Sequence, residues 1–248
     1  MNKEFIPNGE YLNVLMGLGC WKILDANKIL STGIVKVKYK DLMKKLTKLE
    51  KVGLVNSFRK GNAVKHFYLT DQGKKYSGKI SGCGIDADYL NHESATSRVM
   101  WELLKNSELQ NGDGLYYDEI KSVDPDAVIL GKINNQDYKL AIEVELTQKS
   151  SKRVVEKFNR YKQQSLFDYT VYVTQSRTLF NAYKKILDSL CKRVQKQIIL
   201  ILEENLIEGK INFNKSVCFY MNNKVNFTKL LKLESGDFEA NLRRECGE

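Results

Sequence analysis

A short segment rich in glycine and serine divides the chain at residues 77–88. Its sequence, Ser-Gly-Lys-Ile-Ser-Gly-Cys-Gly-Ile-Asp-Ala-Asp, is typical of a linker, because such residues offer little apolar surface to bury. With 248 residues, the chain is long enough for two domains of ordinary size. We therefore predict one domain over residues 1–78, a linker over 79–90 and a second domain over 91–248.

The net charge of +10 is concentrated before this linker. Residues 1–78 contain 15 basic and 6 acidic side chains, whereas residues 79–248 contain 25 and 24. A domain that carries almost all of the excess positive charge is typical of proteins that bind a polyanion, most often nucleic acid. A lysine-rich solvated surface would give the same count, so the charge needs support from the local pattern.

The local pattern in the basic domain predicts helices followed by a hairpin. We expect helices at 9–23, 25–30 and 41–52, strands at 54–59 and 63–69 around a turn at 60–62, and another helix beginning at 70–73. In the third helix, Leu42, Leu46 and Leu49 form one apolar stripe. This order resembles a winged helix-turn-helix. Residues 46–56 and 66–73 resemble the recognition helix and wing of bacterial winged-helix proteins.

By that resemblance, the helix at 41–52 would enter the major groove of double-stranded DNA, and the wing would touch the DNA backbone. The predicted DNA-binding residues are Lys44, Lys45, Lys48 and Lys51 on the helix, with Arg59, Lys60 and Lys65 on the wing. Lysine mostly contacts phosphates, so much of this surface would position the protein rather than read the base sequence. Winged helices also serve as protein–protein modules, and the charge favours DNA.

An alternating strand is the main chemical feature of the second domain. Residues 138–146 alternate, with Glu143 and Glu145 on the polar face, and a buried-looking strand at 123–130 contains Asp126. A two-residue turn at Asn134-Asn135 would place Asp126 directly opposite Glu143. Carboxylates held so close repel each other unless a cation neutralises them, and an all-oxygen site suits Mg²⁺. A hairpin with one solvated face shows the same alternation, so spacing alone leaves both interpretations open.

The same residues resemble the PD-(D/E)xK signature of restriction-endonuclease-like nucleases. Pro125-Asp126 is followed, after a gap of sixteen residues, by Glu143-Val144-Glu145. Helices predicted at 91–105 and 151–165 and a strand at 169–174 match the αβββαβ core of that fold. The expected fold class is therefore α+β, with an N-terminal winged helix-turn-helix followed by a restriction-endonuclease-like αβββαβ domain.

This resemblance implies a role for each candidate residue. Asp126 and Glu143 would hold Mg²⁺ (or Mn²⁺), which polarises a phosphate and lowers the pKa of bound water. Glu145 stands where the family usually has lysine, although some restriction enzymes also carry Glu there, and Lys149 is a candidate replacement. Glu145 or Lys149 would orient or deprotonate the attacking water. Glu93 is a candidate outer metal ligand, with a solvated acid at the start of a helix as the alternative.

The whole order is similar to the replication-relaxation family and to MOBC-type plasmid mobilisation relaxases. The resemblance covers residues 9–174 and includes Asn91-His92-Glu93 and Lys157-Phe-Asn-Arg-Tyr161. It implies metal-dependent nicking of one strand of plasmid or mobile-element DNA at a transfer or replication origin, with other mobilisation or replication proteins, or a second copy, as partners. The alternatives are a sequence-specific replication or transcription factor with an inactive nuclease-like domain, and a restriction or defence nuclease.

The remaining residue inventory excludes several classes of function. Five scattered cysteines without a CxxC pair and only two histidines argue against a disulfide framework, a zinc finger or a multi-histidine metal centre. Nothing singles out a nucleophile among 13 tyrosines, including Tyr116, Tyr117 and Tyr161, so we favour attack by water. The longest apolar run, 198–202, is far below the roughly 20 residues of a membrane helix, and we expect a cytoplasmic protein without membrane contact.

The last third of the chain is less informative. Residues 179–207 are predicted to be helical with one break, and residues 215–220 and 224–228 form a predicted hairpin around Asn222-Asn223. The charged tail at 234–248 is expected to be mobile.

Overall fold

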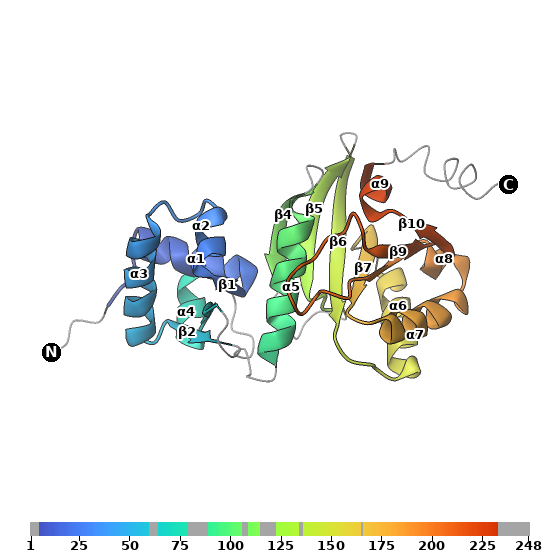
Figure 1. Cartoon of the computed structure of the whole chain (residues 1–248), viewed down its shortest axis with the longest axis horizontal. Coiled ribbons are helices and arrows are strands. Elements are labelled where there is room, and N and C mark those ends of the chain that lie inside the picture. The colour runs from blue at the N-terminus through green and yellow to red at the C-terminus, as the bar shows by residue number, and fades with distance from the viewer. Residues whose placement is uncertain are drawn as a thin grey trace. The chain divides into compact units, whose positions relative to one another are not determined.

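The computed structural model describes residues 5–59, 64–78, 89–105, 109–114, 123–133, 136–164 and 166–232. By its internal contacts the chain divides into one unit of Met1–Ser97 with Asp113–Lys121 and a second unit of Arg98–Gly112 with Ser122–Glu248 (Figure 1). Several predicted features lie outside the described residues: the turn at 60–62, most of the linker at 79–90, the turn at Asn134-Asn135 and the tail at 234–248.

The first unit combines helices with a small antiparallel sheet. Its elements in the described residues are α1 (Glu10–Trp21), β1 (Ile23–Asp25), α2 (Ala26–Ser31), α3 (Tyr39–Lys51), β2 (Val55–Phe58), β3 (His66–Leu69) and α4 (Asp71–Tyr76). The sheet order is β1-β3-β2, with both pairings antiparallel. The predicted helices and hairpin are confirmed. Strand β1 was not predicted, because three residues are too few to show an alternation.

Local interactions and apolar burial explain this arrangement. The predicted stripe of α3 is correct, since Leu42, Leu46 and Leu49 are completely buried. Asp25 caps α2 by accepting a hydrogen bond from Lys28 N at 3.0 Å, and Thr70 caps α4 by accepting one from Gly73 N at 3.0 Å. The order of helices and the three-stranded sheet resemble a winged helix.

The second unit is built on a mixed seven-stranded sheet with strand order β10-β9-β8-β7-β6-β5-β4. Its strands are β4 (Leu109–Gly114), β5 (Ala127–Ile133), β6 (Gln136–Glu145), β7 (Tyr169–Thr174), β8 (Ile198–Leu202), β9 (Val217–Tyr220) and β10 (Asn223–Val225). Its helices, among which α5 begins in the first unit, are α5 (Leu90–Leu103), α6 (Ser151–Gln163), α7 (Arg177–Asp188), α8 (Lys192–Gln195) and α9 (Phe227–Lys232). Strands β6, β7 and β8 run parallel, whereas β5 pairs with β6 antiparallel. The predicted α+β class is confirmed.

The pairing of β5 with β6 follows the predicted register. It joins Ala127 to Ile142 and continues to Ile133 opposite Gln136, which leaves two residues for the turn. Extended by one residue, the same register places Asp126 across from Glu143. The hairpin prediction for these two strands is therefore correct.

One prediction for the second unit was wrong. The segment predicted to be helical at 179–207 contains strand β8 after helices α7 and α8. All five residues of β8 are buried, and β8 lies between β7 and β9. A strand covered on both faces has an uninterrupted apolar sequence, which periodicity cannot distinguish from a buried helix. The predicted hairpin near Asn222 forms between β9 and β10, with its turn at Met221 and Asn222, both at positive φ.

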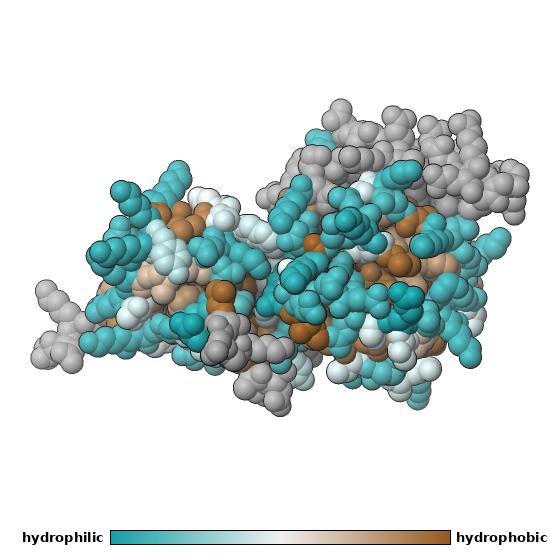
Figure 2. Space-filling model, in the orientation of Figure 1, coloured by the Kyte–Doolittle hydropathy of each residue, from teal (hydrophilic) through white to brown (hydrophobic). Residues whose placement is uncertain are grey.

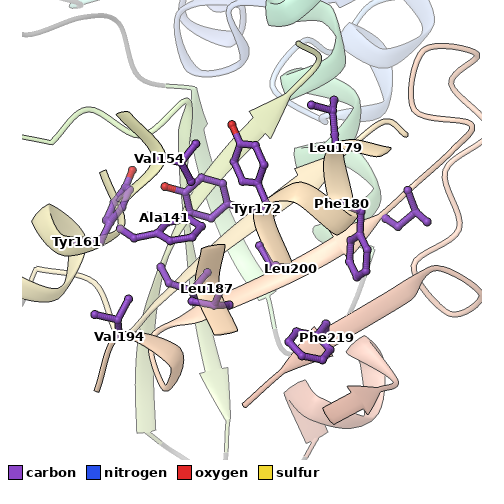
Figure 3. Close-up of a cluster of buried hydrophobic side chains, with 14 of the residues drawn as sticks. Ala141, Val154, Tyr161, Tyr172, Leu179, Phe180, Leu187, Val194, Leu200 and Phe219 are labelled. Atoms are coloured by element: carbon purple, nitrogen blue, oxygen red, sulfur yellow. The ribbon is translucent and has the colours of Figure 1, made fainter. Parts of the chain in front are cut away.

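The main core of the second unit lies between the sheet and helices α6 and α7. Phe158 and Tyr161 of α6, Tyr183 of α7 and Tyr172 of β7 are almost fully buried there with Leu200 (Figure 3). The ring centroids of Phe158 and Tyr172 are 4.9 Å apart in an edge-to-face arrangement. No helix among the described residues is long and apolar enough to cross a membrane.

Candidate active site and basic surface

Asp126 lies at the start of the β5–β6 hairpin and is tied to β6 by its backbone and its side chain. Its amide donates to Ile142 O at 2.9 Å, and its Oδ2 accepts a hydrogen bond from Val144 N at 2.7 Å. The side chain is half-buried. These contacts hold the carboxylate beside β6, in line with the predicted pairing to Glu143.

Glu143 is buried against helix α6, where two side chains bind its carboxylate. Only 1% of its surface is exposed. Lys157 Nζ lies 2.5 Å from Oε2, and the hydroxyl of Tyr161 donates to Oε1. Lys157 and Tyr161 are four residues apart on α6, so both project from the same face of the helix. Each oxygen of Glu143 therefore has a donor from the same helix.

The buried charges shift one another's pKa values. Burial raises the pKa of Glu143 to about 8, with Asp126 adding to the rise and Lys157 opposing it. Burial also raises the pKa of Glu145. Burial alone would lower the pKa of Lys157, but Glu143 and Asp126 outweigh it and raise that pKa. Lys157 is thus the cation that three neighbouring carboxylates share.

A small pocket opens beside these carboxylates. It is lined by Glu145, Lys149, Arg153, Val154, Lys157, Tyr172 and Tyr183. Burial raises the pKa of Tyr183, and the charge of Glu145 raises it further. The pocket joins β6, β7, the first turn of α6 and α7, so it lies on the same face of the sheet as Glu143.

Sequence reasoning did not identify Lys157 or Tyr161 as partners of Glu143. The structure places Lys149 Nζ 3.3 Å from Thr147 Oγ1, and Lys157 rather than Lys149 is bonded to Glu143. The available signal was the four-residue spacing of Lys157 and Tyr161 on an amphipathic helix that directly follows the carboxylate strand. Whether Lys149 acts in catalysis stays a prediction.

The predicted metal site has a partial set of ligands. Asp126 and Glu143 supply carboxylate oxygens, the ligand type that Mg²⁺ prefers, and Mg²⁺ is commonly held by one or two carboxylates with water and substrate phosphate. Within the described part of the chain, no group of three or more His, Cys, Asp or Glu residues is arranged to hold a metal ion. Both carboxylates already accept hydrogen bonds within the chain, Asp126 from Val144 N and Glu143 from Lys157 and Tyr161, and metal binding stays a prediction.

Glu93 lies on α5, in the part of that helix that belongs to the first unit. Its Oε2 is 2.9 Å from Lys22 Nζ, and both side chains are largely buried. An ion pair with Lys22 explains the position of Glu93 without a metal, and its role as an outer metal ligand stays a prediction.

The predicted DNA-binding lysines of α3 fall into two groups. Lys44 and Lys51 are exposed, with Lys44 Nζ 3.7 Å from Asp41 Oδ1, and hydrophilic side chains line the edge of the first unit in this view (Figure 2). The other two lie over aromatic rings: the half-buried Lys45 places its Nζ 4.3 Å from the ring centroid of Tyr11, and the exposed Lys48 places its Nζ 5.3 Å from that of Phe5.

The predicted wing residues also differ in their surroundings. Lys65 Nζ is 2.8 Å from Glu50 Oε2, whereas Arg59 is exposed. Lys60 lies outside the described residues. Lys65 therefore forms an ion pair with an acid of its own chain, and Arg59 is more exposed than Lys65.

Comparisons with known proteins give distant structural matches. Bacillus subtilis PadR in complex with operator DNA is 19% identical over 37% of this chain and 66% of its own, with a TM-score of 0.23. The restriction endonuclease FokI bound to DNA is 12% identical over 80% of this chain and 43% of its own, with a TM-score of 0.25. A second FokI structure is 13% identical over 80% of this chain and 42% of its own, with a TM-score of 0.28. No protein-family model and no curated protein matches the sequence.

Proposed function

We propose that this chain binds double-stranded DNA through its first unit and nicks one DNA strand at the carboxylates of its second. The observation that carries the proposal is the buried carboxylate of Glu143, held between Lys157 and Asp126 beside an open pocket. Burying several charges together is costly and adds little to stability, so such a cluster favours a chemical role.

DNA binding is supported by charge and by arrangement. The first 78 residues carry 15 basic and 6 acidic side chains. Helix α3 presents Lys44 and Lys51 to solvent beside a hairpin that carries Arg59. A basic helix beside a β-hairpin is the arrangement with which winged-helix proteins meet DNA.

The chemistry follows from the cluster on β6 and α6. Asp126 and Glu143 would hold Mg²⁺ or Mn²⁺, which supplies charge for a phosphate in the transition state and lowers the pKa of bound water. The ammonium group of Lys157 lies where it offsets further negative charge. Glu145 or Lys149, which both line the pocket, would accept a proton from the attacking water or orient it. These groups support the proposal of a metal-dependent nuclease, although Glu145 stands where the PD-(D/E)xK signature usually has lysine.

In its finer form, the proposal is a relaxase that nicks plasmid or mobile-element DNA at a transfer or replication origin. This form rests on the resemblance of residues 9–174 to the replication-relaxation family and the MOBC-type relaxases. Other mobilisation or replication proteins, or a second copy of the chain, are the partners that it implies. A restriction or defence nuclease would use the same chemistry on other DNA.

One observation favours a second candidate, a DNA-binding replication or transcription factor whose nuclease-like unit is inactive. Both oxygens of Glu143 are already bonded, one to Lys157 and one to Tyr161. A metal ion would have to compete with the ammonium group of Lys157 for this carboxylate. If neither donor yields, the cluster is a structural ion pair.

The test is nicking of supercoiled plasmid that carries the DNA neighbouring the protein's own gene. We expect Mg²⁺ or Mn²⁺ to convert plasmid to open circles and EDTA to prevent it. Asp126→Asn and Glu143→Gln should each lower the rate at least about 100-fold while DNA binding is retained. Asp188→Asn, which removes an exposed acid of α7, is the matched control. Binding without nicking in the unaltered protein would establish the second candidate instead.

A further inference from the structure

The pocket beside Glu145 has a cationic rim. Arg153 and Lys157 lie four residues apart on α6, and Lys149 precedes this helix. Lys157 is bonded to Glu143, and the charge of Lys149 acts on Glu145, while Lys149 Nζ lies 3.3 Å from Thr147 Oγ1. The exposed guanidinium of Arg153 forms no ion pair with any described residue, so it is the positive charge of the rim that is available to a ligand.

The N-terminal end of α6 adds to this positive potential. The helix has 13 residues, and Ser150 caps it by accepting a hydrogen bond from Arg153 N at 3.3 Å. The first backbone amides of a helix point outward and carry partial positive charge. Arg153 lies in this first turn, so the side chain and the helix end attract the same kind of ligand.

A buried hydroxyl group supplies an independent indication of a ligand. Tyr172 on β7 lines the pocket and is only 1% exposed, yet its hydroxyl has no hydrogen-bond partner among the described residues. A buried polar group without a partner costs about 1–3 kcal/mol. A ligand oxygen in the pocket would accept a hydrogen bond from this hydroxyl and remove that cost.

Glu145 is the acidic side chain in the lining. It is 6% exposed, whereas Arg153 on the rim is exposed. The pocket therefore offers Arg153, Lys149 and the Tyr172 hydroxyl to the ligand.

We propose that this pocket binds one phosphate group of a DNA backbone, held by Arg153, Lys149 and the hydroxyl of Tyr172. It would hold a phosphate that neighbours the one cleaved near Asp126 and Glu143, and so fix the register of the strand. The assignment to DNA rests on the proposed function, whereas the phosphate chemistry rests on the pocket. A free phosphate ion has the same chemistry and is the alternative source.

The test is an NMR titration of the full-length, metal-free protein with two probes, inorganic phosphate and the dinucleotide thymidylyl-thymidine. We expect saturable shifts of the backbone amides at 152–154 with both probes. Arg153→Gln should weaken binding about tenfold, since it removes a charged hydrogen bond. Tyr172→Phe should also weaken binding. Lys152→Gln is the matched control, because it removes one exposed charge from the same turn outside the pocket lining.

Each other outcome overturns the proposal. Shifts that never saturate, or an equal loss in Lys152→Gln, would show general attraction to a basic surface. Binding of inorganic phosphate without the dinucleotide would exclude a DNA backbone as the ligand. Tyr172→Phe keeps the buried ring and loses an unpartnered hydroxyl, so this variant should fold even if Arg153→Gln does not.

The same titration separates this proposal from the nicking activity. In Asp126→Asn with Glu143→Gln, nicking should be lost while both probes still bind. Dinucleotide binding by a protein that never nicks would support the pocket and contradict cleavage. Nicking without probe binding would support cleavage and overturn the pocket.

Discussion

At Glu143, burial and charge act in opposite directions. Burial favours the protonated carboxyl group, whereas the ammonium group of Lys157 favours the ionised one. The balance leaves the pKa at about 8, so the group changes charge near physiological pH. A small change in the burial of Glu143 or in its distance from Lys157 would therefore decide whether the carboxyl group is ionised and can bind a cation.

This balance predicts that the metal-free protein loses stability as pH rises from about 5 to 8. The folded state holds the Glu143 proton more tightly, so the contribution is complete below 4.5, its ordinary pKa, and is lost as pH rises through about 8. One such group contributes at most about 1.4 kcal/mol per pH unit. Glu145, whose pKa is also raised, acts in the same direction. Urea unfolding in EDTA measures this slope, and Glu143→Gln should flatten it. If the dependence of the unfolding free energy on pH is the same in Glu143→Gln, a group other than Glu143 causes it.

The two lysines near the cluster should differ in their effect on stability. Lys157→Met leaves Glu143 buried without its cation, which we expect to cost about 3 kcal/mol above pH 8 and less near pH 5, where the carboxyl group is protonated. Lys149 lies beside Thr147, so Lys149→Met should change stability by less than about 0.5 kcal/mol. Urea unfolding of both variants at the two pH values provides the measurement. Equal losses would contradict the assignment of Lys157 as the partner of Glu143.

At the scale of elements, the strands and registers that could be predicted are those with an alternating sequence and a short turn. The register of β5 with β6 follows from a two-residue turn, so the approach of Asp126 to Glu143 was predictable. The helix α6 was predicted as an element, but its rotation about its own axis depends on packing against the sheet. That rotation turns Lys157 toward Glu143. Strand β8 escaped prediction because a fully buried strand has no polar face.

A close approach of backbones in the first unit gives a prediction for α4. A Cβ atom added to Gly73 would lie 1.9 Å from the carbonyl oxygen of Leu54, which accepts a hydrogen bond from Thr70 N. Gly73→Ala should therefore destabilise the first unit by about 2–3 kcal/mol. Gly17→Ala in α1 is the control, because its Cβ would meet Ile34 at an ordinary 3.7 Å and alanine favours a helix. Thermal unfolding should show a clear loss for Gly73→Ala alone, and similar results for both would contradict this close approach.

At the scale of the whole molecule, charge and chemistry are assigned to different units. Nearly all of the excess positive charge lies in the first 78 residues, whereas the buried carboxylates belong to the second unit. The concentration of charge in the first 78 residues could be counted from the sequence, because a charge count needs no knowledge of packing. The use of each lysine was not predictable, because the rings of Tyr11 and Phe5 bind Lys45 and Lys48 through contacts that only the folded chain makes.

Because the positive charge is concentrated in the first 78 residues, we expect DNA affinity to fall as salt rises, and we expect the exposed lysines of α3 to account for part of that dependence. Each phosphate contact contributes about −0.9 to the slope of log affinity against log salt. Lys44→Ala with Lys51→Ala should therefore weaken binding and make the slope shallower by about 1 per lysine. Fluorescence anisotropy with a labelled duplex at several salt concentrations measures both quantities.

The matched control removes two exposed lysines of the second unit, Lys185→Ala with Lys192→Ala. This control changes the net charge by the same amount. If α3 has a specific role, the control should bind DNA with nearly the same dependence on salt as the unaltered protein. If both double variants lose the same affinity, binding follows net charge alone. If neither loses affinity, α3 is not the DNA-binding surface. A loss confined to Lys44 and Lys51 would show that the basic helix, rather than the total charge, brings DNA to the protein.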